Sequence, residues 1–77
     1  MSYEQLTRIA EKNIRKCGLD SQGVRYISEL SKASALLGLW YELAIHGAPQ
    51  NNYAQARERI DADHQRLRNL IWPENDR

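Results

Sequence analysis

Two pairs of side chains have the spacing at which one helix presents two metal ligands on the same face. Glu42 and His46 are four residues apart, and Asp61 and His64 are three apart. Metal sites in helical bundles use more carboxylates at tighter spacing, and a histidine near a helix C-terminus is ordinarily a favourable charge or a cap. We therefore predict no metal site and no cofactor in this chain.

Cys17, the single cysteine of the chain, is the candidate nucleophile. A cysteine attacks as the thiolate, which needs a neighbouring base, and no histidine lies near Cys17 in the sequence. The sequence also contains no glycine-rich phosphate loop, no paired catalytic carboxylates and no serine-based catalytic constellation. We therefore expect no enzymatic activity, and we expect Cys17 to be buried on the apolar face of a helix.

A row of basic side chains follows one face of the first expected helix, opposite its apolar stripe. The row consists of Arg8, Lys12, Arg15 and Lys16. It could line up against phosphate groups or an acidic partner protein, but a charged outer face is also typical of any amphipathic helix in water. The whole chain has 11 basic and 10 acidic side chains and a net charge of +1, which argues against binding a polyanion through bulk charge alone.

The turn after this helix resembles the helix-turn-helix of small repressors. The residues that stand at the spacings of that motif, within residues 10–29, are Cys17, Gly18, Leu19, Val24 and Ile27. The resemblance implies that the first turns of the second helix face the major groove of DNA. The groove-facing residues would be Ser21, Gln22, Arg25 and Tyr26. Gln22 and Arg25 are of the types that bind adenine and guanine edges, so a dimeric DNA-binding regulator is one predicted function.

Three helices are predicted to hold these side chains in a single domain, residues 1–77. They are expected at residues 3–17, 22–46 and 52–72, followed by a polar tail at residues 73–77. Ser2 and Gln5 have the spacing of a capping box, in which each side chain binds the other residue's backbone amide at a helix start. Gly18 is expected to end the first helix in the left-handed conformation, and Asp20 or Ser21 is expected to cap the second.

The central segment is the longest and the most apolar. From Ala33 to Ile45 its only clearly polar members are Ser34 and Glu42. A helix that is apolar around most of its circumference must be covered on several sides, by its own chain or by another copy. The apolar run is only about half the length of a membrane span, which takes on the order of 20 residues. We therefore predict an all-α protein in which three antiparallel helices form a homodimeric bundle, without a membrane helix.

The chain is too small to bury a large core by itself. A domain of 77 residues buries only roughly 60% of the surface that its unfolded chain exposes, and one cysteine cannot form an internal disulfide. Association with a second copy is therefore the expected supplement. Since the sequence shows no secretory signal, we expect a cytoplasmic protein.

Self-association is predicted through the central helix. The predicted contacts are Leu36, Leu37, Gly38, Trp40, Tyr41 and Leu43. Gly38 is either a tolerated weak point or a place where a second helix crosses closely. The first predicted function is a non-enzymatic binding protein, an accessory regulator or inhibitor that contacts a larger protein. The basic row, with Gln22 and Arg25, is predicted to contact that partner or a nucleic acid.

Overall fold

The computed structural model describes residues 1–20 and 22–73. Helix α1 spans Tyr3–Lys16, α2 spans Gly23–His46 and α3 spans Tyr53–Ile71, with a short 3-10 helix, η1, at Gln50–Asn52. The described part of the chain contains no β-strand, and the prediction of an all-helical fold with three packed helices is confirmed. Ser21 and residues 74–77 of the predicted tail lie outside the described residues.

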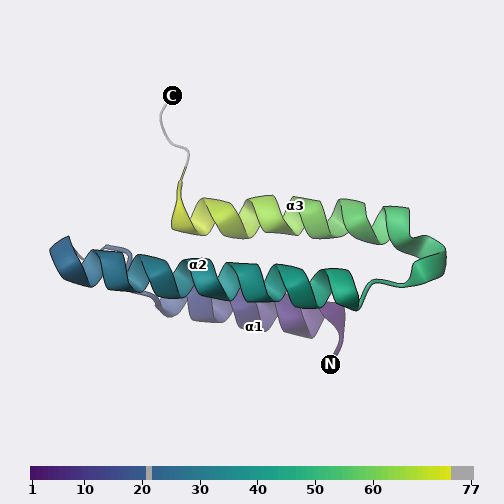
Figure 1. Ribbon diagram of the computed structural model, residues 1–77, viewed down its shortest axis with the longest axis horizontal. Coiled ribbons are helices and arrows are strands. Elements are labelled where there is room, and N and C mark those ends of the chain that lie inside the picture. Colours follow the sequence, from purple (N-terminus) through teal and green to yellow (C-terminus); the bar gives the residue numbers. More distant parts are fainter. Residues whose placement is uncertain (21, 74–77) are drawn as a thin grey trace.

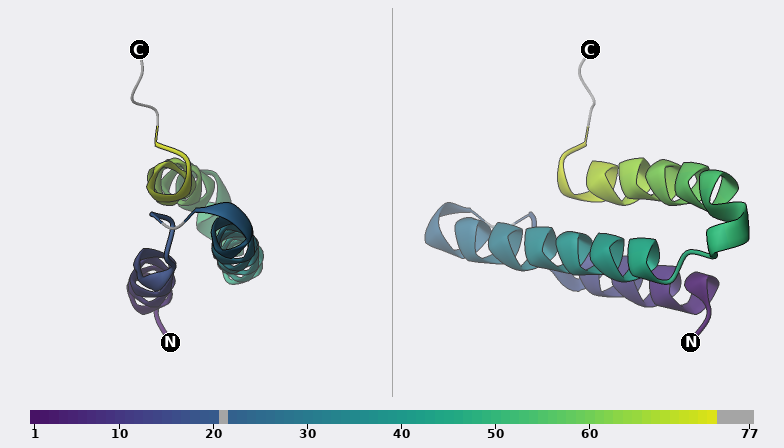
Figure 2. Two further views of the ribbon diagram at one scale, coloured as in Figure 1. Left: turned by 90° about the vertical axis from the view of Figure 1, so that its left-hand side faces the viewer. Right: turned by 45° about the vertical axis from the view of Figure 1, so that its right-hand side comes forward.

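The three helices lie side by side, with α1 and α3 pointing in the same direction and α2 in the opposite one (Figure 1). Seen from the end of the bundle, they occupy the corners of a triangle (Figure 2). Helix α2 is the longest, with 24 residues, and its first turns extend beyond the end of α3 (Figure 1). The first turn of α1 lies beside the last turn of α2, so the N-terminus lies near the connection between α2 and α3 (Figure 1).

Local signals explain the start of α1 but not its end. The Ser2 N–H donates to the Gln5 side chain at 2.9 Å and the Gln5 N–H donates to Ser2 Oγ at 3.1 Å, so the predicted capping box is present. Gly18 does not end α1 in the left-handed conformation, because the chain already leaves the helix at Cys17 in an extended conformation. The Gly18 N–H instead donates to the Glu29 carboxylate of α2 at 3.1 Å.

The start of α2 also differs from the prediction. Its N-cap is Gln22, and the Gln22 side chain does not cap the first turn. The expected cap by Asp20 is not found, and the alternative, Ser21, lies outside the described residues. Gly23 has a φ of 68°, and no other described residue has a positive φ. Glycine adopts this conformation without the steric cost that a side chain brings. A left-handed glycine therefore turns the chain into α2 where a capping side chain was expected.

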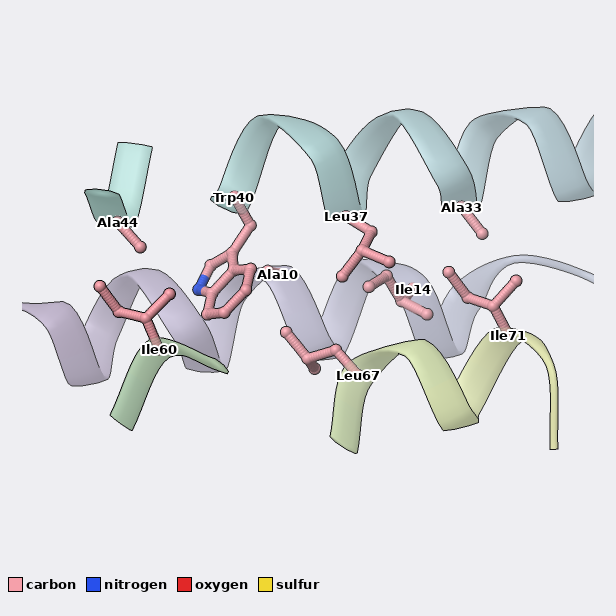
Figure 3. Close-up of a cluster of buried hydrophobic side chains, with 9 residues drawn as sticks. All are labelled: Ala10, Ile14, Ala33, Leu37, Trp40, Ala44, Ile60, Leu67 and Ile71. Atoms are coloured by element: carbon pink, nitrogen blue, oxygen red, sulfur yellow. The ribbon is translucent and has the colours of Figure 1, made fainter. Parts of the chain in front are cut away.

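The core forms where one face of each helix meets the other two (Figure 3). Its buried apolar side chains are Ala10 and Ile14 of α1, Ala33, Leu37, Trp40 and Ala44 of α2, and Ile60, Leu67 and Ile71 of α3. The alanines allow the helices to approach closely, and Trp40 fills the space between them. The Trp40 indole N–H donates to the buried Thr7 hydroxyl at 2.9 Å, so the ring is buried with its polar atom satisfied.

Leu37 and Trp40 are therefore occupied within the single chain. Their side chains are 6% and 2% exposed, because α1 and α3 both pack against the face of α2 that carries them. Neither residue is available to a second molecule in this fold. Their place in the predicted self-association surface is corrected for this reason.

Polar contacts hold the start of α1 against α3. The Tyr3 hydroxyl donates to Asp63 at 2.6 Å, and the Arg59 guanidinium lies 4.6 Å from the centre of the Tyr3 ring. Arg59 also forms an ion pair with Glu4 at 2.9 Å. Since exposed ion pairs contribute only about 0 to 1 kcal/mol, we attribute more of the docking of α3 to the packing and hydrogen bond of Tyr3.

The titration of Tyr3 tests this contact. Burial, and then the hydrogen bond to Asp63, raises the pKa of Tyr3 from 10.0 to about 12. The folded state thus holds the phenolic proton more tightly than the unfolded state, so this contribution to stability is complete below pH 10 and is lost as the pH rises through 12. In an ultraviolet phenolate titration, we expect a late step that Tyr3→Phe removes and the control Tyr53→Phe retains. A late step that survives in Tyr3→Phe would contradict the assignment.

Candidate protein-docking groove

An open groove runs between α1 and α2, and no α3 residue lines it. It is a hollow of about 510 Å³. Its lining residues are Asn13, Lys16 and Cys17 of α1, and Glu29, Lys32, Ala35, Leu36 and Leu39 of α2. In the end view α3 packs on the other side of these two helices (Figure 2). The groove is therefore left open by the intramolecular fold.

The apolar lining continues along both helices towards the N-terminus. A second hollow between them is lined by Met1, Leu6 and Leu43, among others. Ile9 follows Leu6 by three residues and precedes Asn13 by four, so it lies on the same face of α1. The side chains of Ile9, Leu39 and Leu43 are 46%, 56% and 47% exposed. We call the surface strip between α1 and α2 that includes both hollows the α1–α2 groove. Met1 lies at one end of this strip and Lys32 at the other.

The sequence produces this groove because α2 carries two apolar stripes. Ala33, Leu37, Trp40 and Ala44 form the stripe that faces the core. Leu36, Leu39 and Leu43 form the second stripe, at three- and four-residue steps along its edge. A helix of this kind needs cover on more than one side. Helices α1 and α3 cover the first stripe fully and the second only in part.

Positive charge borders one end of the groove. Lys12 and Lys16 are exposed on α1, and neither forms an ion pair with any residue in the part of the chain that the structure describes. Lys32 binds Glu29 at 3.3 Å. The Gly18 N–H and then Lys32 lower the pKa of Glu29, so this carboxylate already has two partners. Glu42 is exposed on α2, but it lines neither hollow of the groove.

The predicted basic row does not act as one unit. Arg15 pairs with Glu11 at 2.9 Å. Arg8 lines a separate polar hollow between α1 and α3, together with Arg59 and Arg66. Of the four residues in the row, Lys16 lines the groove, and Lys12 lies one turn before it on α1. Neither of the two forms an ion pair among the described residues.

The segment that resembles a helix-turn-helix has a different geometry. In that motif two helices cross at about 90–120°, whereas α1 and α2 run antiparallel along each other (Figures 1 and 2). Gln22 and Arg25 are exposed and Tyr26 is half-buried at the start of α2, and Ser21 lies outside the described residues. Nucleic-acid binding by these residues stays a prediction from the sequence alone.

Three side chains of the types that bind metals make contacts within the fold. His64 stacks on Trp40 at a centroid distance of 6.3 Å and meets the edge of Tyr41 at 5.0 Å. Asp61 accepts a hydrogen bond from Arg57 at 3.4 Å. The half-buried Cys17 thiol donates to the Asn13 carbonyl at 3.5 Å. Among the residues that the structure describes, no three His, Cys, Asp or Glu side chains come together as a metal site.

Sequence reasoning missed Ile9 and Leu39 as surface residues. The signal was present in the spacing of Leu36, Leu39 and Leu43, which forms a stripe of its own beside the core stripe. Within the described residues, none of the helices is both long and apolar enough for a membrane span. No family model matches the chain, and neither the curated proteins nor the solved structures include a match to it.

Proposed function

We propose that this chain is a non-enzymatic helical binding protein, an accessory regulator or inhibitor that acts by protein–protein contact through the α1–α2 groove. The observation that carries the proposal is the line of half-exposed apolar side chains Ile9, Leu39 and Leu43. These residues lie outside the cluster of buried core side chains. Amphipathic helices bind in apolar grooves of this kind, and a docked helix would complete a four-helix bundle.

Self-association through the same groove belongs to the proposal. Of the residues predicted for it, Leu36 and Leu43 line the groove, and we add Leu39. Tyr41 instead packs on His64 of α3. Gly38 is exposed, and nothing lies within 4 Å of the position that a Cβ would take, so none of the helices that the structure describes crosses there. A second copy is thus one occupant to be tested for the groove.

Site-specific photo-cross-linking tests the proposed function. A photoreactive amino acid replaces Ala35, which is exposed in the groove, and in the matched control it replaces Ala62, which is exposed on α3. In cells that produce the protein, we expect discrete adducts from position 35 that Leu39→Ser removes. An adduct of twice 9.0 kDa identifies a second copy, and a larger one identifies another protein.

The control position decides how these adducts are interpreted. Adducts specific to position 35 support the groove as the docking surface. If positions 35 and 62 give the same adducts, or if Leu39→Ser leaves the adducts from position 35 unchanged, the groove is not the contact and the proposed function fails.

A further inference from the structure

We infer that the α1–α2 groove binds an acidic amphipathic helix of another protein, an inference that rests on the proposed function and names its partner. The groove follows α1, which has 14 residues and is therefore roughly 21 Å long at about 1.5 Å per residue. An occupant of this length is a helix of about four turns. One apolar residue on each turn would contact Leu6, Ile9, Leu39 and Leu43.

The positive charge at the border of the groove favours an acidic partner helix. Lys16 and Lys32 line the end of the groove next to the α1–α2 connection, and the exposed Lys12 lies one turn before Lys16 on α1. Glu29 is the acidic residue of the groove lining there, and its carboxylate is already bonded to Lys32 and to the Gly18 amide. Aspartate or glutamate side chains on the partner would pair with Lys12 and Lys16. Complementary charge of this kind favours one partner over others and fixes its direction.

The lysines also set the direction of the partner helix. Lys16 and Lys32 line the end of the groove next to the α1–α2 connection, so the acidic residues of the occupant gather at that end. Apolar residues of the occupant are expected at the opposite end, which Leu6 and Leu43 line.

The same charges favour this occupant over two others. A second copy offers no unbonded carboxylate in its groove lining, because Glu29 is the acidic residue there and is already bonded, so it would leave the lysines without partners. A nucleic-acid backbone would pair with the lysines, but its phosphates would gain nothing from the half-exposed Leu39 and Leu43. The acidic amphipathic helix uses both the apolar lining and the basic border.

Two synthetic helical peptides of about four turns provide the test. Both carry the same leucine stripe, flanked by glutamate in one and by lysine in the other. Binding of each labelled peptide to the full chain is measured by fluorescence anisotropy at low salt. We expect the glutamate peptide to bind about tenfold more tightly or better, and this advantage to shrink as salt rises.

Reversing the charge of the two α1 lysines tests whether these residues cause the preference for the glutamate peptide. The double variant Lys12→Glu with Lys16→Glu should invert the preference between the two peptides. The control Arg57→Glu with Arg68→Glu makes the same charge change on α3 and should leave the preference as it was. Circular dichroism melting of each variant verifies that it folds.

The outcomes separate this inference from the proposed function. Equal binding of both peptides that Leu39→Ser abolishes would overturn the acidic partner while the groove stays the docking surface. A preference that survives the Lys12 and Lys16 reversal would also overturn it, as would the absence of binding by either peptide. An inverted preference in the double variant alone supports it.

Discussion

Replacing Trp40 with alanine is expected to lower the free energy of unfolding by about 3 to 5 kcal/mol, the usual cost of truncating a buried aromatic side chain. The ring is 2% exposed, lies 6.3 Å from the ring centre of His64, and donates a hydrogen bond to Thr7. Small domains have total stabilities of roughly 5 to 15 kcal/mol. The substitution should therefore remove a large share of the stability, which chemical denaturation followed by circular dichroism measures.

Trp72 is the matched control for this prediction. It is 39% exposed, and the Arg68 guanidinium lies 5.6 Å from the centre of its ring. Trp72→Ala should cost much less than Trp40→Ala, because part of that ring is already in water. Trp40→Phe should fall between the two, since it keeps most of the apolar volume and loses a hydrogen bond worth about 1 kcal/mol. Equal losses for Trp40→Ala and Trp72→Ala would contradict the described core.

The helices themselves could be predicted because their signals are local. The capping box of Ser2 and Gln5 depends on residues three positions apart, and the structure contains it. The end of α1 could not be predicted in this way. The Gly18 amide is bound by Glu29, eleven positions away, and the side chain that decides the conformation of Gly18 therefore belongs to another helix.

The division of α2 into core and surface depends on the same kind of distant contact. Leu39 and Trp40 are neighbours in the sequence and both are apolar, yet one is 56% exposed and the other 2%. The direction from which α1 and α3 approach α2 makes this difference. The Tyr3 hydrogen bond to Asp63 joins residues 60 positions apart, and no local pattern indicates such a pair. The sequence thus predicted that α2 needs cover on several sides, but it did not indicate which side α1 and α3 leave exposed.

The groove and the core should respond in opposite ways to the same substitution at two leucines. Leu67 is fully buried in the core, so Leu67→Ala should lower the free energy of unfolding by about 2 to 5 kcal/mol. Leu39 is half in water, and Leu39→Ala should change stability by less than about 1 kcal/mol, as surface substitutions usually do. Denaturant titration of both variants measures these losses on one scale.

Binding should show the reverse order. Leu39→Ala removes an apolar contact from the α1–α2 groove and should weaken docking of the glutamate peptide, whereas folded Leu67→Ala protein should bind it as the unmodified chain does. If Leu39→Ala were as destabilising as Leu67→Ala, Leu39 would belong to the core and the groove would be part of the fold. A small loss of stability together with a large loss of binding is the combination that only a docking surface produces, because its side chains serve a contact that the single chain does not make.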